Sequence, residues 1–235
     1  MHILAFDTCL DACSVAVARC DEAGCVELAS ALERFETGHA ERLVPIIDEA
    51  MQAAGLDFSA IDRIAVTHGP GTFTGTRIGI AAARALALAT GAEIVAASSL
   101  AVMAEVAAAE LSLPGLEPAV MVAVDARRRE VYAQSFDADG RTSLSPPQLL
   151  SIADAARLGA PASLLVVGSA AEVVAEAAAE AGRPARAALP ELLPAASALA
   201  RMAATLAPLT EPLRPLYLRP PDAKPQTGKS IARAP

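Results

Sequence analysis

A glycine-rich segment between a predicted strand and a predicted helix is the strongest candidate for chemistry in this sequence. Residues 69–75 read Gly-Pro-Gly-Thr-Phe-Thr-Gly. Glycines that follow a strand and open a helix expose backbone amide hydrogens at the positive end of the helix dipole, where phosphate groups bind. Gly69, Gly71 and Thr72 are therefore candidate phosphate-binding residues. The alternative is that the glycines only permit a tight turn and a close approach of the helix.

This segment fits neither standard phosphate-binding fingerprint. Thr74 stands where a dinucleotide-binding loop has a further glycine. Arg77 stands where a Walker loop has its lysine. Both lysines of the chain lie beyond residue 223. The main body of the sequence therefore offers no lysine for phosphate binding or for Schiff-base chemistry.

Small residues recur every four positions along the predicted helix, at Gly75, Gly79 and Ala83. Residues four apart lie on one helix face, so these three form a stripe against which another backbone can pack closely. The neighbour is either the chain's own sheet or a partner's helix. Periodicity does not distinguish the two.

Two aspartates follow predicted strands, which is where phosphate-binding folds place metal-bridging carboxylates. Asp7 and Thr8 end the first strand, and Asp125 ends a later strand before the triplet Arg127–Arg129. No glycine occurs in the turn after Asp7, and a cramped turn disfavours the close approach of phosphate. The region of Asp125 is locally explained as a solvated hairpin. Asp7, Thr8 and Asp125 join the glycine-segment residues as candidates for a vestigial phosphate loop.

The cysteines have spacings that occur in zinc sites, but the predicted strands keep them apart. Cys13 and Cys20 lie at opposite ends of one predicted strand, roughly 23 Å apart at ~3.3 Å per residue. Zinc ligands converge within about 2.3 Å of one ion, so Cys9, Cys13, Cys20 and Cys25 are not expected to bind zinc. A disulfide is not expected either, because the cytosol is reducing. No metal and no cofactor are predicted.

Composition and charge restrict the class of protein. Hydrophobic residues make up 54% of the 235 residues, which is enough for a substantial core. The formal net charge of -8 excludes a broad electropositive surface for nucleic acid. Residues 212–235 differ, with five basic residues against one acidic residue, and their prolines predict an extended tail. The start resembles no signal peptide and no apolar stretch approaches ~18 residues, so a cytoplasmic protein that spans no membrane is expected.

Hydrophobic patterning predicts an α/β protein in which a strand meander and strand–helix units occur twice. Strands are expected at residues 3–6, 13–18, 25–31, 61–67, 93–97, 119–125, 130–136 and 164–168. Helices are expected at residues 43–54, 75–90, 98–110, 170–181 and 194–206. Turn residues at 112–115 indicate a boundary, which divides the chain into an N-terminal lobe (1–112), a C-terminal lobe (113–210) and a basic tail (211–235).

Five segments, taken in order, resemble the TsaB family, formerly called YeaZ. They are Asp7-Thr8-Cys9, His39-Ala40-Glu41, residues 69–79, residues 125–132 and Leu216-Tyr217-Leu218-Arg219. The resemblance runs nearly from end to end, and the eleven residues 69–79 are much more specific than a generic glycine loop. It implies the fold shared by actin, sugar kinases and heat-shock chaperone ATPases, with two lobes that each hold a mixed sheet flanked by helices.

The resemblance also implies a function. TsaB is a non-catalytic accessory subunit of the complex that makes threonylcarbamoyladenosine in tRNA. It pairs through its N-terminal lobe with the catalytic subunit TsaD, is joined by the ATPase TsaE, and meets tRNA through the complex. The interface is expected on the helices after residue 38 and after Gly75, with Leu43, Ile47, Gly75, Arg77, Gly79 and Ala83 as the candidate residues.

Two further functions stay open at this stage. The first is a nucleotide-dependent enzyme of the same superfamily, and the second is a small glycoprotease. TsaD carries a His-x-x-x-His metal pair in a helix where this chain has Ser98-Ser99-Leu100-Ala101-Val102-Met103, and no nucleophile and base are paired in the sequence. A homodimer of the isolated chain and nucleotide binding at a subunit junction are also left open.

Overall fold

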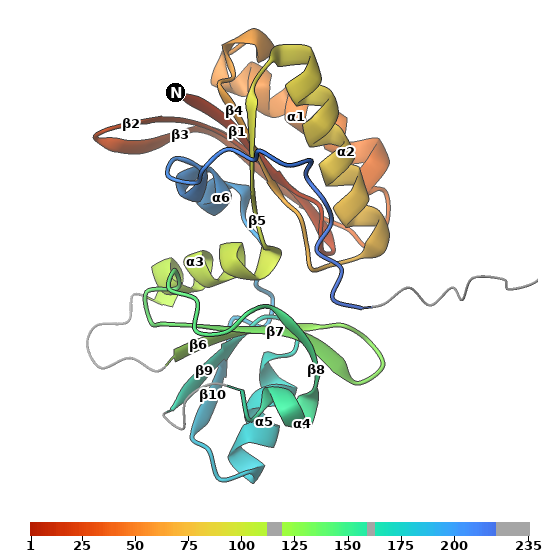
Figure 1. Ribbon diagram of the computed structural model, residues 1–235, viewed down its shortest axis with the longest axis vertical. Helices are drawn as coiled ribbons and strands as arrows, with labels where there is room; N and C mark the ends of the chain where they lie inside the picture. Colours follow the sequence, from red (N-terminus) through yellow and green to blue (C-terminus); the bar gives the residue numbers. More distant parts are fainter. Residues whose placement is uncertain (112–118, 159–162, 220–235) are drawn as a thin grey trace, which may run out of the picture.

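Two sheets, one above the other, form the two lobes of the molecule (Figure 1). The computed structural model describes residues 1–111, 119–158 and 163–219. The predicted boundary at residues 112–115 and the end of the basic tail lie outside these ranges. Each sheet has five strands and helices on its faces, as the sequence predicts for an α/β fold of two lobes.

The first sheet has the strand order β3-β2-β1-β4-β5. Its strands are β1 (His2–Asp7), β2 (Ala12–Asp21), β3 (Gly24–Arg34), β4 (Arg63–Thr67) and β5 (Glu93–Ala97). The first three form the predicted antiparallel meander, and β4 and β5 continue the sheet in parallel to β1. The central strand β1 is buried from Ile3 to Asp7, so it reads as a continuous apolar run.

Helices α1 (His39–Ala54) and α2 (Phe73–Thr90) cover one face of this sheet, and a short helix, η1 (Phe58–Ala60), follows α1. The apolar side of α1 contributes Leu43, Ile46 and Ile47 to a core shared with β1, β2 and β4. Thr72 caps α2, because its hydroxyl accepts a hydrogen bond from the backbone nitrogen of Gly75.

The second sheet repeats the topology of the first, with the order β10-β9-β6-β7-β8. Its strands are β6 (Ala119–Asp125), β7 (Glu130–Phe136), β8 (Gln148–Ser151), β9 (Leu164–Val167) and β10 (Ala185–Ala188). Helix α3 (Ser99–Leu111) packs on one face of this sheet. Helices α4 (Ile152–Ala155) and α5 (Ala171–Glu180) lie on the other face. The sequence did not predict β8, α4 or β10, each only four residues long.

Helix α6 (Ala196–Ala203) corrects the expected division of the chain. Residues 113–210 were assigned to the C-terminal lobe, but α6 packs on the first sheet, where Ala196, Leu199 and Ala203 share a core with Ile3 and Ala65. The chain therefore returns to the first lobe before its end. Helical periodicity located α6 but could not say which of two sheets its apolar face covers.

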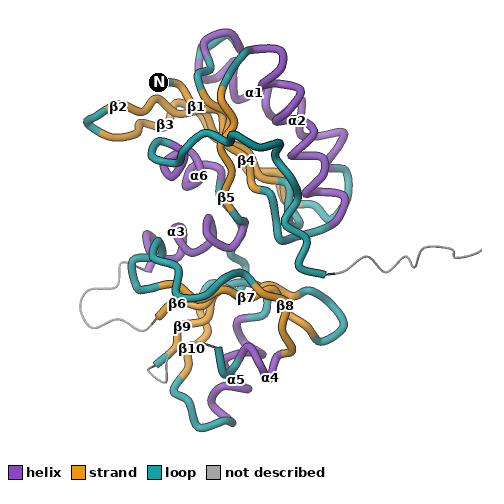
Figure 2. The backbone as a smooth tube through the Cα atoms, in the orientation of Figure 1, coloured by secondary structure: helices purple, strands orange, loops and turns teal. Residues whose placement is uncertain are grey.

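After α6, residues 207–219 form an extended segment that we call the strap. It runs as a loop past the first sheet toward the second lobe (Figure 2). The backbone nitrogens of Leu209 and Leu216 donate to the carbonyl oxygens of Ile94 and His68, at 2.9 and 2.7 Å. Arg219 then forms an ion pair with Glu130 of β7, at 2.6 Å. The strap therefore ties the two lobes together.

The cysteines also differ from the sequence-based expectation. Cys20 and Cys25 form a disulfide, with their Cα atoms 4.0 Å apart. Strands β2 and β3 extend further toward their shared turn than predicted, so these two residues face each other in register. The expectation of no disulfide is therefore wrong. Cys9 and Cys13 are free and buried.

Candidate functional site

The glycine-rich loop is filled by the turn that follows β1. The backbone nitrogen of Thr72 donates to the carbonyl oxygen of Cys9 at 2.7 Å. A Cβ atom on Gly71 would lie 2.2 Å from that same oxygen, and a Cβ on Gly75 would lie 2.0 Å from the carbonyl oxygen of Thr8. Glycine is needed at both positions because backbone occupies the space of a side chain. The turn after β1 thus packs directly against the glycine-rich loop and leaves no room for side chains at Gly71 and Gly75.

The other candidate phosphate residues take part in the same packing. The hydroxyl of Thr8 donates to the carbonyl oxygen of Gly75 at 2.7 Å. Gly69 has a φ of 108°, and a Cβ atom on it would meet the backbone of Leu216 in the strap at 3.0 Å. This geometry matches the alternative drawn from the sequence, in which the glycines permit a tight turn and close helix approach.

Asp7 is buried beneath this junction. The hydroxyl of Thr67 donates to its Oδ1 atom, and the backbone nitrogen of Cys9 donates to the same atom at 3.3 Å. Its Oδ2 atom has no hydrogen-bond partner among the described residues. Burial raises the pKa of the Asp7 carboxyl to about 6, against the lowering effect of these hydrogen bonds. Burial also raises the pKa of the Cys9 thiol far above its ordinary value, which removes its nucleophilic thiolate form.

Asp125 lies at the corresponding place in the second lobe, but it is exposed. Its Oδ1 atom accepts a hydrogen bond from the backbone nitrogen of Arg127 at 2.8 Å, which closes the turn between β6 and β7. Asp7 and Asp125 thus serve two different turns, one buried and one open to solvent.

The small-residue stripe on α2 faces the chain's own sheet, which corrects the expected interface. A Cβ atom on Gly79 would lie 2.6 Å from the hydroxyl oxygen of Thr8, and Ala83 is fully buried. Leu43 and Ile47 of α1 are likewise core residues. With Gly75, five of the six candidate interface residues are therefore internal, and only Arg77 is exposed.

The outward faces of α1 and α2 carry a different set of apolar residues. Leu88, Val44 and Phe73 are 90%, 64% and 60% exposed. Ala81 and Ala85, four residues apart, are exposed on α2. A groove of about 590 Å³ runs between the helices, and its lining residues are mainly apolar: Val44, Pro45, Ile47, Asp48, Phe58, Ala82, Ala85 and Leu86. We call this surface the α1–α2 face.

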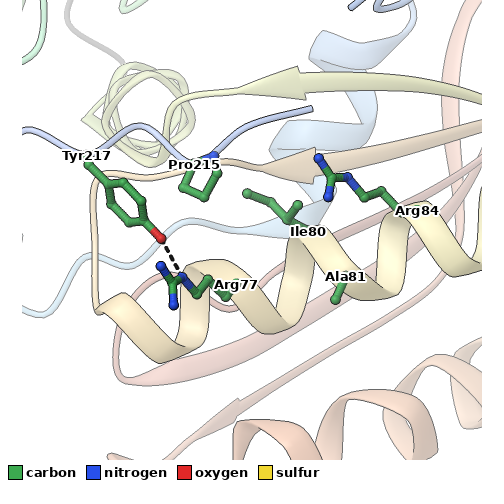
Figure 3. A pocket seen from close by; sticks show the side chains of 6 residues that line it. All are labelled: Arg77, Ile80, Ala81, Arg84, Pro215 and Tyr217. Carbon is green, nitrogen blue, oxygen red and sulfur yellow. Dashed lines mark hydrogen bonds between the residues drawn. The ribbon is translucent and has the colours of Figure 1, made fainter. Parts of the chain in front are cut away.

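Arg77 joins the α1–α2 face to the strap (Figure 3). Its Nε atom donates to the hydroxyl oxygen of Tyr217 at 2.5 Å, and its guanidinium carbon lies 3.6 Å from the ring centroid of Phe73. The rings of Phe73 and Tyr217 are stacked, 5.7 Å apart. Arg84 donates to the carbonyl oxygen of Leu213. A hollow of about 360 Å³ lies here, lined by Arg77, Ile80, Ala81, Arg84, Pro215 and Tyr217. The segment around Tyr217 and Arg219 is therefore docked on the rest of the chain.

Comparisons with known proteins agree on a family. The model of the family described as "TsaD: tRNA N6-adenosine threonylcarbamoyltransferase" matches residues 33–213. The solved structure "YeaZ from Pseudomonas aeruginosa" is 31% identical and superposes with a TM-score of 0.75, over 92% of this chain and 99% of that chain. The chain belongs to the TsaB (YeaZ) family.

Two sequence relatives show how much of the chain is covered by this similarity. The "tRNA threonylcarbamoyladenosine biosynthesis protein TsaB" of Haemophilus influenzae is 38% identical over 133 residues, which is 56% of this chain and 52% of that protein. The chain thus spans about half the length of this curated relative. An uncharacterized protein of Mycobacterium tuberculosis is 32% identical over 225 residues, 95% of this chain and 94% of that one.

Membership of the TsaB family confirms the predicted actin-like, two-lobed fold. Within the described residues, no helix is both long and apolar enough to cross a bilayer. The α1–α2 face was not predicted from the sequence, although the sequence contains a signal for it. Apolar residues occur around the whole of α2, so a second apolar side beyond the buried one could have been expected.

Proposed function

We propose that this chain is a non-catalytic accessory subunit of the complex that makes threonylcarbamoyladenosine in tRNA, and that it docks on TsaD through the α1–α2 face. The observation that carries the proposal is the exposed apolar surface on α1 and α2, which includes Leu88 and Val44. The chain would act in the cytoplasm, with TsaE joining the pair and tRNA reached through the assembly.

The α1–α2 face has the features of a helix-packing surface. Ala81 and Ala85 lie side by side on α2 and let a partner helix approach closely, within the 8–10 Å range usual for packed helices. Leu88 and Val44 add large exposed aliphatic side chains to the same face. Burying one such side chain contributes about 1.5–3 kcal/mol. An apolar surface of this kind marks an interaction site more often than a solvated helix.

The non-catalytic assignment rests on the filled glycine loop. The carbonyl oxygens of Thr8 and Cys9 occupy the space beside Gly75 and Gly71, so a phosphate group has no room there. An anion would also meet these two oxygens, which carry partial negative charge. The nucleotide-dependent enzyme remains the second candidate, because the same superfamily fold binds nucleotides. The glycoprotease is disfavoured by the buried thiol of Cys9.

The proposal is tested by capture of TsaD. Replacing Leu88 with glutamate places a charge at the most exposed apolar side chain of the face, so affinity for TsaD should fall at least tenfold, which corresponds to about 1.4 kcal/mol. Val173→Glu on α5 is the matched control, since Val173 is also an exposed aliphatic residue on a helix. Equal TsaD affinity for both variants would overturn the docking assignment.

Two accompanying measurements test the remaining parts. Sedimentation of the isolated chain reports whether it forms a homodimer, and Leu88→Glu should dissociate a dimer that uses the same face. The purified chain with ATP and Mg²⁺ should show no hydrolysis without TsaD. Robust turnover by the chain alone would favour the nucleotide-dependent enzyme instead.

A further inference from the structure

The turn between β6 and β7 is both strained and strongly basic. Arg127, Arg128 and Arg129 are all exposed, and their φ angles are 62°, 58° and 62°. The left-handed region is disfavoured for residues that carry a Cβ atom, and non-glycine residues enter it mostly one at a time. Glycine or asparagine would form this turn with less strain. The backbone conformation of this turn therefore does not favour arginine at these positions.

The guanidinium groups of Arg127 and Arg129 have no recorded hydrogen-bond or ion-pair partner among the described residues. The two acids beside them are already engaged. Asp125 accepts the backbone nitrogen of Arg127 at 2.8 Å, and Glu130 pairs with Arg219 of the strap at 2.6 Å. The Arg127 and Arg129 side chains are thus exposed to solvent without an ion pair among the described residues, in a chain whose net charge is -8.

The residues around the turn argue against a peptide as its ligand. None of the exposed large hydrophobic residues of the described chain lies in β6, β7 or the turn between them. An acidic peptide would need apolar pockets or an exposed sheet edge beside the charges to gain affinity and register. β6 and β7 are both flanked by other strands, so they offer no edge. Charge is the main feature that the turn presents.

We propose that this turn binds the phosphodiester backbone of RNA, with Arg127 and Arg129 as the residues that contact phosphate. The guanidinium group is planar and presents paired N–H donors that match phosphate oxygens. The turn projects from the end of a hairpin, so it can reach a polyanion that the acidic remainder of the chain repels. Contacts of this kind position the RNA without reading its sequence. The identity of the RNA as tRNA rests on the proposed function.

The test measures binding of an unmodified tRNA transcript to the full chain, alone and together with TsaD, by fluorescence anisotropy at several KCl concentrations. The test variant is Arg127→Ala with Arg129→Ala. The control is Arg157→Ala with Arg186→Ala, which removes the same charge from exposed positions elsewhere in the second lobe. Thermal unfolding of both variants checks that each remains folded. A third variant, Arg127→Lys with Arg129→Lys, keeps the charge without the paired donors.

The test variant should bind tRNA at least tenfold more weakly, and its dependence of log K on log salt should be shallower by about 1 to 2. The control should stay within about twofold of the natural chain, and the lysine variant should lie between them. Equal tRNA affinities for the test and control variants would overturn the proposal, as would the absence of tRNA binding at about 50 mM KCl in both settings. Displacement of tRNA by equimolar polyglutamate would also overturn it.

Capture of TsaD by the same variants separates this proposal from the proposed function. Normal capture with lost tRNA binding supports the RNA site, and normal capture with unchanged tRNA binding overturns the RNA site alone. Failure of the natural chain to capture TsaD would count against the proposed function, whatever its tRNA affinity.

Discussion

The two lobes share one strand order but treat the first turn of their sheets in opposite ways. In the first lobe the turn after β1 is locked into the glycine-rich loop, where the carbonyl oxygens of Thr8 and Cys9 fill the space beside Gly75 and Gly71. In the second lobe the turn after β6 projects into solvent and carries three arginines. Topology therefore fixes where these turns lie but not what they can bind.

The loop that faces each turn accounts for the difference. In the second lobe the loop after β9 docks below the turn, because the backbone nitrogen of Ala170 donates to the carbonyl oxygen of Ala123 at 3.1 Å. A Cβ atom on Gly168 would meet this same oxygen at 2.7 Å. The contact is therefore made to strand β6 itself rather than to the turn beyond it. The arginines of the second turn are exposed, whereas Thr8 and Cys9 of the first turn are buried against the glycine-rich loop.

The largest expected effect comes from breaking the lock in the first lobe. Gly75→Ala forces a methyl group to within 2.0 Å of the carbonyl oxygen of Thr8, and only a backbone shift can relieve the clash. Overpacking of this kind should lower the free energy of unfolding by about 3 kcal/mol, as measured by urea denaturation. Gly91→Ala is the control, since a Cβ atom there meets open space and only the left-handed backbone is strained, at about 1 kcal/mol.

If Gly75→Ala lowered the free energy of unfolding no more than Gly91→Ala does, the glycine-rich loop and the turn after β1 would not be tightly packed. The proposed difference between the turns of the two lobes would then be contradicted. The same measurement bears on the non-catalytic assignment, because a loosely packed turn would leave room for phosphate beside Gly71.

The second prediction concerns the buried carboxyl beneath that lock. The pKa of Asp7 is raised to about 6 in the folded chain, above its ordinary value of 3.8. Its protonated form therefore stabilises the fold fully below pH 3.8, and this contribution is lost as the pH rises through 6. Asp7→Asn has no carboxyl group to ionise, so its stability should not show this decrease with rising pH. Relative to the natural chain, this variant should gain up to about 3 kcal/mol between pH 4 and pH 8.

Urea denaturation at pH 4, 6 and 8 measures this difference. Asp125→Asn is the matched control in the second lobe, where the carboxylate is exposed and accepts a backbone hydrogen bond that the asparagine oxygen can also accept. A pH-independent difference between Asp7→Asn and the natural chain would show that Asp7 does not titrate in this range.

Much of the fold, but less of the site, could be predicted from the sequence. The hydrophobic pattern of the sequence predicts long apolar strands such as β1 and the amphipathic helix α1. The spacing of Gly75, Gly79 and Ala83 also predicts a small-residue stripe, but Gly79 in this stripe faces Thr8 in the turn after β1 and Val66 of β4 in the chain's own sheet. A helix that is apolar on several sides does not say which side meets the core, so Ala81, Ala85 and Leu88 were not predicted.

Other features depend on contacts between distant parts of the chain. The pairing of Arg219 with Glu130 joins residues 89 positions apart, and no local pattern predicts it. The sequence around Arg127–Arg129 predicts a hairpin. It does not predict the left-handed backbone of these three residues, because arginine has no preference for left-handed backbone angles. Short strands such as β8 and β10 carry too few residues for a period to be recognised.

The smallest expected effect has the opposite sign and belongs to the turn of the second lobe. Arg129→Gly removes the left-handed strain at one residue, which stabilises the folded chain by about 1–2 kcal/mol. The greater conformational freedom of glycine stabilises the unfolded chain by roughly 0.5–1 kcal/mol and so offsets part of this gain. The free energy of unfolding should therefore rise by about 0.5–1 kcal/mol, although a solvent-exposed arginine has been removed. Arg186→Gly, at an exposed position of strand β10, should instead destabilise, because glycine weakens a strand. If Arg129→Gly raises the free energy of unfolding and lowers tRNA affinity, the arginine in this turn favours binding at the expense of stability. The turn after β1 would then be the opposite case, because its packing favours stability and leaves no site for a ligand. If Arg129→Gly destabilised the chain as much as Arg186→Gly does, the arginine itself would support the fold, and the difference between the two turns would be one of packing alone.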